Sequence, residues 1–384
     1  MKNTNWQEIE LGVILSFQSR TGRKAGEGLE DGKYKFFTSS NVQSKKINEF
    51  DFDGEHLIFS SGGQAGVHYC NERFSASNDC FVVSIKDKVL TEYIYYYLKS
   101  KMHILERGFK GAGLKHISKS YIEKIKFIYP INIRVQQEII NLLKKSEKAS
   151  INGKGVLELF DEYLKSVFYE LLSKGSLNYS RWSKVKLKEV LAKPKGSIRT
   201  GPFGSDLLHS EFVSKGIAVL GIDNVVNNYF SWDERRYITK EKYEKLKRYT
   251  VHPKDVLVTI MGTVGRSVVV PENIPLAINT KHLVAITLNN DIADPFYISY
   301  LIYSDPGVLH QLNIRMRGAI MPGLNMSIIE NLSFSLPPIN IQRKFSSIIE
   351  HVERLKEKQK EKNKMLNQIF DSLMQKAFRG ELIK

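Results

Sequence analysis

The stretch PINIRVQQEIINLL at residues 130–143 has a counterpart in PINIQRKFSSIIEHV at residues 338–352. Each opens a long segment in which apolar residues recur at the spacing of a helix. Proline suits the first turn of a helix, so each PINI predicts the point where a globular region passes into a helix. A four-letter match is weak alone, and its weight depends on whether the neighbouring segments repeat in the same order.

The neighbouring segments do repeat in the same order. The matched pairs are WQEIEL (6–11) with WSKVKL (182–187), SSNV (39–42) with IDNV (222–225), LIFSSGGQAG (57–66) with VLVTIMGTVG (256–265), IEKIKF (122–127) with IENLSF (329–334), and LFDEYLKSVF (159–168) with IFDSLMQKAF (369–378). The spacing between copies grows along the chain, which indicates insertions in surface loops of the second copy. The chain is therefore predicted to contain two copies of one unit.

The segments after the two prolines are predicted to be long helices. Apolar residues form a heptad seam in the second helix at Phe345, Ile348, Val352, Leu355, Leu366, Ile369 and Leu373, and the first helix offers Ile139, Leu142, Phe160 and Leu164. Gln359 and Lys362 interrupt the second seam. In the first helix, Gly153 and Gly155 would each cost about 1 kcal/mol relative to alanine, which predicts a kink or short loop near residue 153. The helices either pair with each other or each cover their own domain.

Composition indicates a folded protein with a polyanionic partner. The 384 residues are 42% apolar, and the formal net charge is +16 with a pI near 9.5. Nucleic acid is the usual partner of such a chain, and a merely basic surface is the alternative. The sequence lacks an apolar run of membrane-spanning length and a signal peptide, so we expect a cytoplasmic protein without membrane contact. Cys70 and Cys80 are interpreted as packing residues rather than metal ligands.

The motifs of DNA-processing enzymes are missing. The sequence has no N/D-P-P-Y/F motif of an amino-methyltransferase, no G-x-x-x-x-G-K-[ST] phosphate loop and no Pro-Asp dipeptide of the kind that anchors many nucleases. We therefore expect a non-catalytic chain without a cofactor or metal of its own.

Several strings make the chain resemble the specificity subunit of type I restriction-modification systems. They are IRTGPFGSDL (198–207), VTIMGTVG (258–265) and PPINIQRKF (337–345) followed by LMQKAFRGEL (373–382), set in the double arrangement described above. The resemblance covers essentially the whole chain. It implies an α+β fold with a pseudo-twofold internal repeat, in which two homologous mixed α/β target-recognition domains are separated by two long helices that form an antiparallel coiled coil.

The resemblance also implies domain limits and partners. The expected regions are recognition domain 1 at 1–130, a central helical spacer at 131–175, recognition domain 2 at 176–337 and a C-terminal helical spacer at 338–384. Each recognition domain would read one half of a bipartite site in double-stranded DNA, while the helices set the gap and dock two modification subunits. S-adenosylmethionine would be bound by those modification subunits, and restriction/translocase subunits would complete the assembly.

DNA contacts are carried over residue by residue. The loop GPFGS gives Gly201, Pro202, Phe203, Gly204 and Ser205, preceded by Arg199 and Thr200; the first copy has only TGRKAG at 21–26, where Arg23 and Lys24 would contact phosphate. Glycines allow backbone N–H groups to approach phosphate, although a tight structural turn would have the same sequence.

The paired glycine loops supply the remaining candidates. They offer Ser60, Ser61 and Gln64 in one copy and Thr259, Thr263 and Arg266 in the other, with Lys115, His116, Arg315, Arg317 and Asn325 in later loops. Plain hairpin turns and ordinary solvated charges remain the alternatives for these positions. At the level of function, the alternatives are a complete DNA-modifying enzyme with unrecognised motifs and a coiled-coil scaffold that joins two protein-binding domains.

Overall fold

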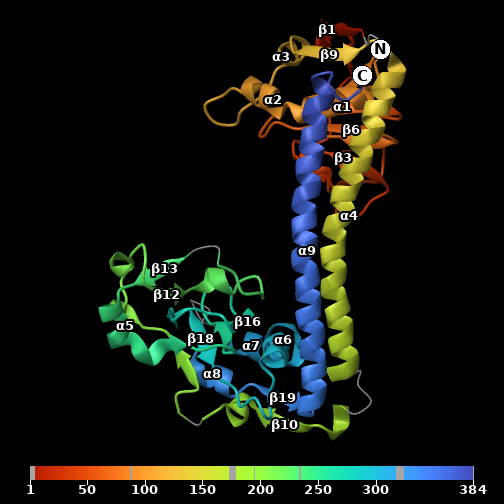
Figure 1. The fold of residues 1–384 in the computed structure, drawn as a ribbon. Helices are drawn as coiled ribbons and strands as arrows, with labels where there is room; N and C mark the ends of the chain where they lie inside the picture. Colours follow the sequence, from red (N-terminus) through yellow and green to blue (C-terminus); the bar gives the residue numbers. More distant parts are fainter. Residues whose placement is uncertain are drawn as a thin grey trace. The chain divides into compact units, whose positions relative to one another are not determined.

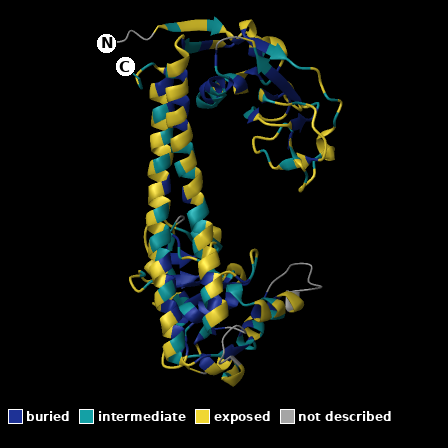
Figure 2. Cartoon of the chain, turned by 90° about the vertical axis from the view of Figure 1, so that its right-hand side faces the viewer, coloured by how far each residue is buried: buried dark blue, intermediate teal, exposed yellow. Residues whose placement is uncertain are grey.

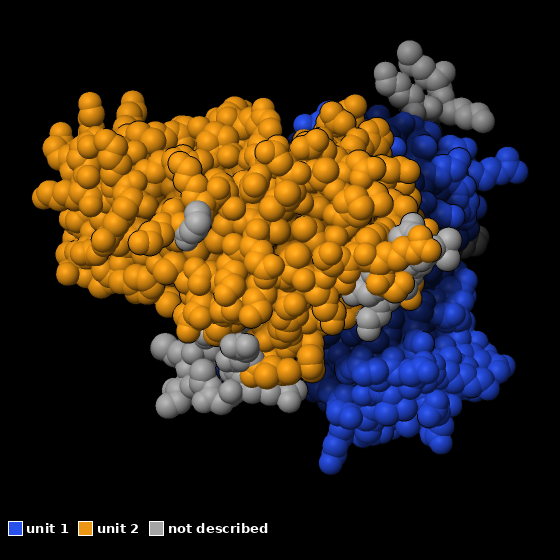
Figure 3. Space-filling model, turned by 90° about the horizontal axis from the view of Figure 1, so that it is seen from below, with its two compact units in different colours: residues 1–156, 359–384 blue, residues 157–358 orange. Residues whose placement is uncertain are grey.

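The computed structural model describes residues 5–86, 89–172, 179–193, 195–232, 235–316 and 324–383. The chain divides into two compact units, which Figure 3 colours separately. Unit 1 comprises Met1–Val156 and Gln359–Lys384, and unit 2 comprises Leu157–Lys358. In these described ranges, no helix is both long enough and apolar enough to cross a membrane.

Unit 1 contains three small sheets and short helices (Figure 1). Its strands are β1 (Trp6–Glu10), β2 (Leu15–Phe17), β3 (Tyr34–Phe37), β4 (Lys45–Ile47), β5 (Glu55–Ser60), β6 (Val67–Asn71), β7 (Phe74–Ala76), β8 (Cys80–Ile85) and β9 (Lys126–Pro130). Its short helices are α1 (Thr91–Ser100), α2 (Met102–Gly108) and α3 (Lys119–Glu123). The sheets have the strand orders β2-β8-β5-β6, β4-β3-β7 and β1-β9.

Unit 2 is built from corresponding elements. Its strands are β10 (Ser183–Lys186), β11 (Ile198–Thr200), β12 (Ile217–Leu220), β13 (Arg236–Ile238), β14 (Thr250–Val251), β15 (Val256–Thr259), β16 (Ser267–Val269), β17 (Ala277–Asn279), β18 (Leu283–Ile286) and β19 (Ser333–Leu336). Its short helices are α5 (Lys240–Leu246), α6 (Pro295–Ser304), α7 (Pro306–Met316) and α8 (Met326–Glu330). The sheets have the orders β11-β18-β15-β16, β13-β12-β17-β14 and β10-β19.

The strand pairings confirm the internal repeat. The β2-β8-β5-β6 order in unit 1 corresponds to β11-β18-β15-β16 in unit 2, and the parallel pair β3–β7 corresponds to β12–β17. In the two-stranded sheets, Ile9 lies opposite Phe127 and Val185 lies opposite Phe334. These four residues are equivalent in the repeat read from the sequence, so the predicted α+β class with two mixed domains is confirmed.

Two long helices, α4 (Ile133–Leu172) and α9 (Ile339–Phe378), contribute to both units. Within unit 1, Ser150 of α4 donates a hydrogen bond to Asn367 of α9. Within unit 2, Nζ of Lys356 lies 2.7 Å from Oδ1 of Asp161. Later residues of α4 therefore pair with earlier residues of α9, which confirms an antiparallel coiled coil. Figure 2 shows buried and exposed residues alternating along both helices.

The last turns of each long helix complete a globular core. Phe168 near the end of α4 packs in unit 2, with its ring centroid 6.3 Å from that of Tyr297, the residue that corresponds to Tyr93 in the repeat. Phe378 at the end of α9 packs in unit 1, with its ring 5.4 Å from that of Tyr93. The sequence match of LFDEYLKSVF with IFDSLMQKAF thus reflects equivalent aromatic contacts in the two units.

The short loop that the sequence allowed near residue 153 is wrong, because α4 runs as one continuous helix from Ile133 to Leu172. Gly153 is buried, and a Cβ atom there would lie 2.0 Å from Oδ1 of Asn363. The glycine therefore allows α9 to approach the backbone of α4 closely, and the helix tolerates its low propensity because the contact stabilises it.

The predicted seam is correct at most positions and displaced at two. Ile139, Leu164, Phe345 and Val352 are buried, while Phe160, Ile348, Leu355, Leu366 and Leu373 are half-buried. Leu142 and Ile369 are instead exposed, and their neighbours Leu143 and Phe370 pack in the core of unit 1. A helix with 3.6 residues per turn drifts from a strict heptad, which moves the apolar stripe by one residue at these points.

The two PINI strings are not structurally equivalent. Pro130 is the last residue of β9, whereas Pro338 directly precedes α9. Gln136 donates to the carbonyl oxygen of Pro130 at 2.9 Å, and Gln342 donates to that of Pro337 at 2.7 Å. The buried Gln136 and Gln342 therefore occupy corresponding positions at the starts of the two helices. The match of the PINI strings is shifted by about two residues from this structural correspondence. The prediction of a helix after each proline nevertheless holds.

Candidate nucleic-acid interface

Both units carry the same glycine loop after a buried strand. The loop following β5 is closed by a hydrogen bond of 3.0 Å from the amide of Ser60 to the carbonyl oxygen of Gly66. The loop following β15 is closed by a hydrogen bond of 2.9 Å from the amide of Gly265 to the carbonyl oxygen of Thr259. Gly63 and Gly262 occupy equivalent positions with φ of +77° and +73°, a conformation that favours glycine.

In unit 1, the glycine loop lies against the loop that contains Lys115 and His116. The amide of Gly63 donates to the carbonyl oxygen of Lys115 at 3.0 Å, and Ile117 donates to Ser61 at 3.1 Å. The side chains of Gln64, Lys115 and His116 are exposed beside one another, whereas Ser60 and Ser61 are buried. The structure thus brings together three of the five residues predicted for these loops as accessible polar groups, and the two serines shape the loop.

Asn41 belongs to the same surface, although the sequence analysis did not select it. Its exposed side chain donates a hydrogen bond of 3.2 Å from Nδ2 to Oε1 of Gln64. This hydrogen bond uses one donor of Asn41 and one acceptor site of Gln64. The other amide donors and acceptors of both side chains can still bond the edge of a base. Asn41 belongs to the SSNV string that repeats as IDNV in the second copy. That string was used as evidence for the repeat and was not considered as a binding site.

The glycine loop of unit 2 exposes Thr263 and Arg266. Among the residues that the structure describes, the guanidinium of Arg266 has no ion-pair partner. Thr259 is fully buried, and its hydroxyl accepts a hydrogen bond of 2.9 Å from the amide of Arg266. Thr259 therefore stabilises the loop conformation from within the protein core. Of the three residues predicted for this loop, only Thr263 and Arg266 are accessible to a ligand.

Arg199 is placed differently from the prediction. Its guanidinium forms an ion pair with Asp255, whose side chain is fully buried, and donates 2.8 Å to the carbonyl oxygen of Thr250. The neighbouring Thr200 is half-buried in β11. A carboxylate without solvent requires a paired cation, so the charge of Arg199 is used inside the protein rather than offered to phosphate.

The GPFGS loop combines a structural turn with an exposed tip. A Cβ atom at Gly201 would lie 2.2 Å from the carbonyl oxygen of Asn279, so this glycine is required by close backbone packing. Phe203, Gly204 and Ser205 are exposed, with Gly204 at φ +56°. The loop is therefore a structural turn at its first residue and leaves an accessible surface beyond it.

A cavity of about 350 Å³ lies beside this loop in unit 2. Polar groups that line it come from Asp223, Arg236, Thr280 and His282. Burial, with the nearby charges of Lys281 and Arg236, lowers the pKa of His282, which favours the neutral imidazole. The side chain can then both donate and accept hydrogen bonds near neutral pH.

The TGRKAG string of unit 1 offers less than predicted. The guanidinium of Arg23 lies 2.7 Å from Asp51 and 3.1 Å from Glu49, so two carboxylates already neutralise it. Lys24 is exposed and remains available to a phosphate. The difference arises because Glu49 and Asp51 come from a distant loop whose approach the local sequence does not reveal.

The last predicted group lies at the end of unit 2. Asn325 caps α8, with its side chain accepting 2.9 Å from the amide of Ile328. Arg317 lies outside the described residues, and so does the side chain of Arg315. In the part of the chain that is described, no three His, Cys, Asp or Glu side chains gather in a way that could hold a metal ion, and Cys70 and Cys80 are buried free thiols.

Comparison with known proteins identifies the family. The family model described as type I restriction modification DNA specificity domain matches residues 3–157 and 179–368. The type I restriction enzyme MjaVIII specificity subunit of Methanocaldococcus jannaschii is 22% identical over 357 residues, which cover 88% of this chain and 81% of that protein.

Solved structures agree in fold. The S subunit of a type I restriction-modification system from M. genitalium superposes with a TM-score of 0.64 at 18% identity, covering 98% of this chain and 97% of its own. A chain from a study of complex assembly and conformational transition of the type I R-M system gives a TM-score of 0.59 at 14% identity, covering 98% of each. The chain therefore belongs to the family of type I restriction modification DNA specificity domains, with two matched regions that coincide with its two repeats.

Proposed function

We propose that this chain is the sequence-reading subunit of a type I restriction-modification complex, in which residues 1–130 and 176–337 each read one half of a bipartite DNA site. The observation that carries the proposal is the recurrence of one glycine loop with exposed polar or cationic side chains in both units, on a chain of net charge +16. A single protein with two equivalent reading surfaces suits a target with two separated parts.

The exposed side chains differ between the units in a way that favours different half-sites. Unit 1 presents Gln64, and an amide can bond adenine bidentately in the major groove. Unit 2 presents Arg266, and a guanidinium can bond guanine in the same manner. We assign Lys24 and Lys115 to phosphate contacts, because flexible ammonium groups position a protein on DNA without reading sequence.

The remaining functions of the complex are assigned to partners. We propose that two modification subunits dock on the coiled coil, that they bind S-adenosylmethionine, and that restriction/translocase subunits join the same assembly. This chain itself is proposed to be non-catalytic. The proposal rests on the family and on the motifs of methyl transfer, nucleotide binding and cleavage that the sequence lacks.

One set of measurements tests this proposal. The purified chain should bind duplex DNA with an affinity that falls by about 0.9 log unit per log unit of salt for each phosphate neutralised. It should not methylate DNA, and calorimetry should detect S-adenosylmethionine binding only after modification subunits are added. Micromolar cofactor binding or methyl transfer by the chain alone would favour a complete modifying enzyme. Absence of DNA binding at low salt would favour a protein scaffold.

A further inference from the structure

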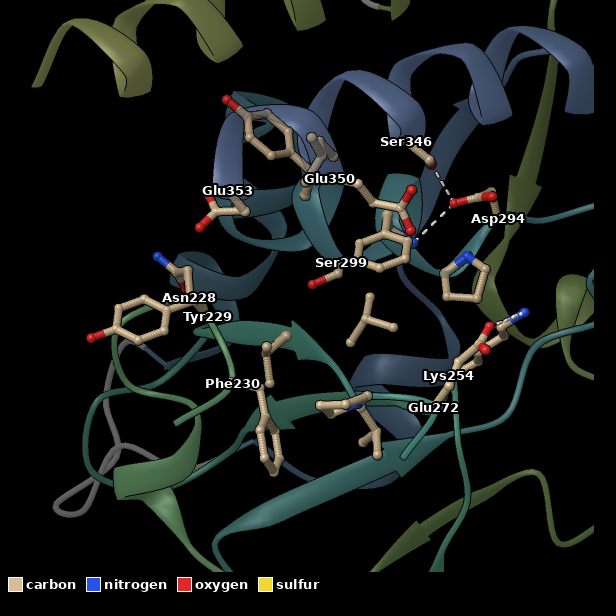
Figure 4. Close-up of a pocket in the computed structure, with 18 of the residues that line it drawn as sticks. Asn228, Tyr229, Phe230, Lys254, Glu272, Asp294, Ser299, Ser346, Glu350 and Glu353 are labelled. Atoms are coloured by element: carbon tan, nitrogen blue, oxygen red, sulfur yellow. Dashed lines mark hydrogen bonds and ion pairs between the residues drawn. The ribbon is translucent and has the colours of Figure 1, made fainter. Parts of the chain in front are cut away.

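A second cavity of unit 2 is lined by none of the residues of the glycine loop. It is a cavity of about 760 Å³ bounded by α6, the first half of α9 and the strand β16 (Figure 4). Its apolar lining comes from Phe230, Val268, Phe296 and Tyr300. A space of this size, with aromatic walls, can take one or two side chains of a partner.

The helix side of the cavity is acidic. Glu350, Glu353 and Glu357 follow one another at steps of three and four on α9, so they share one helix face and all line the cavity. Glu353 is neutralised by Lys356, whose Nζ lies 2.9 Å away. Glu350 and Glu357 are exposed, and no cation pairs with either among the described residues.

The cations that line the cavity do not balance these carboxylates. Lys254 is bound to Glu272 at 2.9 Å. Arg343 donates to the carbonyl oxygen of Asn290 at 3.0 Å. The cavity therefore carries net negative charge on a chain whose overall charge is +16, and DNA phosphates would be repelled from it.

The third wall is an edge strand that is partly covered: Val269 is 8% exposed, and the amide of Ser267 on the same edge already donates to Oδ1 of Asn228 at 3.2 Å. β16 is the edge strand of its sheet, and Val269 lies opposite Val256. Hydrogen bonds join the pairs on either side, from Val270 to Asp255 and from Thr259 to Arg266, each at 2.9 Å. Because bonded and non-bonded pairs alternate in antiparallel sheets, the N–H and C=O of Val269 point away from β15 toward the open edge.

We infer that this cavity docks an extended, basic segment of a protein partner, which in the proposed complex is a segment of a modification subunit. A lysine or arginine of that segment would pair with Glu350 and Glu357, an apolar side chain would enter beside Tyr300, and its backbone would bond Val269. Edge strands commonly bind extended peptides in this way. The inference rests on the proposed function for the identity of the partner, while the chemistry of the partner follows from the cavity.

A charge-reversal pair tests the acidic wall. The E350K/E357K variant should weaken assembly of the full chain with modification subunits by at least about tenfold, since two charge-assisted contacts become repulsive. The matched control is E241K/E244K, which makes the same change in charge at exposed positions of α5 in the same unit, outside both the cavity and the coiled coil. Sedimentation velocity measures assembly, and fluorescence anisotropy measures DNA binding by the chain alone.

A second variant tests the edge strand without altering charge. V269P removes an N–H that does not bond β15, at a place where proline is tolerated in sheets. Because Val269 is buried, the change also costs packing, so V269A, which loses packing but keeps the N–H, is the matched control. V269P should weaken assembly more than V269A, while DNA affinity stays near that of the unaltered chain.

Three results would overturn the inference: assembly unchanged in both cavity variants, an equal loss in the E241K/E244K control, or a selective change in DNA affinity in the cavity variants. Failure of the unaltered chain to assemble with modification subunits would instead overturn the proposed function, and the choice of partner with it.

Discussion

The side-chain amide of Asn363 donates a hydrogen bond of 2.9 Å to the main-chain carbonyl oxygen of Gly153, which joins α9 to α4 inside unit 1. Gln359 donates to the same oxygen at 3.3 Å. Asn363 is buried, so sliding one helix along the other would leave its amide without a partner at a cost of about 1–3 kcal/mol. This polar contact therefore fixes the register of the coiled coil, as single buried asparagines do elsewhere.

Alanine substitutions at the two helix glycines should have opposite effects on stability. G153A places a Cβ against Asn363 and breaks its hydrogen bond, which should exceed the gain in helix propensity and lower the free energy of unfolding by about 1 kcal/mol. G155A meets no atom within 4 Å and should raise it by up to about 1 kcal/mol. Urea unfolding of both variants measures the difference. Equal changes in the free energy of unfolding in G153A and G155A would show that the contact between Gly153 and Asn363 does not contribute to stability.

The sequence contained both halves of this contact without revealing their connection. Gly153 predicted a break in one helix, and Gln359 appeared as a defect in the seam of the other. Each residue is unfavourable within its own helix and becomes favourable only when the two helices meet. The missing side chain of Gly153 lets α9 approach the backbone of α4, and the amide of Gln359 then finds a carbonyl oxygen to bond. Local propensity describes one helix at a time and therefore could not distinguish a kink from a contact.

Arg199 should act on stability rather than on DNA binding. R199A would leave the carboxylate of Asp255 buried without its cation, which should lower the free energy of unfolding by about 3 kcal/mol. An R199A/D255N double variant should recover part of that loss, because it removes the unpaired charge. Denaturation measures both. A large loss of DNA affinity in R199A with unchanged stability would contradict the assignment.

Arg266 should show the converse behaviour. Its exposed guanidinium does not contribute to packing, so R266A should leave unfolding within about 0.5 kcal/mol of the unaltered chain. Binding to the cognate site should weaken by about 1–3 kcal/mol if Arg266 reads a base. The control is R354A, which removes an equivalent exposed charge from α9 in the same unit. Equal losses in the two variants would indicate only a general effect of charge.

His68 makes the stability of unit 1 depend on pH. Burial lowers its pKa, with a further contribution from Lys99, although its Nε2 lies 2.8 Å from the carbonyl oxygen of Ser40. The unfolded state, with a histidine pKa near 6.5, then binds protons more readily than the folded state. The free energy of unfolding should fall as pH decreases below about 6.5 toward the lowered folded pKa. H68Q should reduce that slope, and an unchanged slope would exclude His68 as its source.

The candidate site was predictable where a repeat marked it. Gln64 and Arg266 occupy matching loops, and their exposure follows from strand ends that the sequence showed twice. Arg23 and Arg199 were predicted as phosphate ligands because cations beside glycines are typical of such sites. Their acidic partners Asp51 and Asp255 lie far away in the sequence, so only the fold shows that these charges are already neutralised.

The coiled coil should determine the unread gap of the target. Seven residues inserted into each long helix near the paired positions Asp161 and Lys356 would keep the seam and add about 10 Å at 1.5 Å per residue. At about 3.4 Å per base pair, the gap should widen by about three base pairs with both half-sites unchanged. Sequencing of methylated sites in cells that carry the active variant measures the gap. An unchanged gap would show that the helices do not set the spacing.

The central claim, that each repeat reads its own half of the DNA site, is tested most directly by a domain exchange. Residues 1–130 are replaced by the corresponding domain of another family member, and the methylated sequences in cells that also express the modification subunits are determined genome-wide. The account predicts that one half-site changes to that of the donor while the other half-site and the gap stay the same. A change in both halves, or in neither, would contradict it.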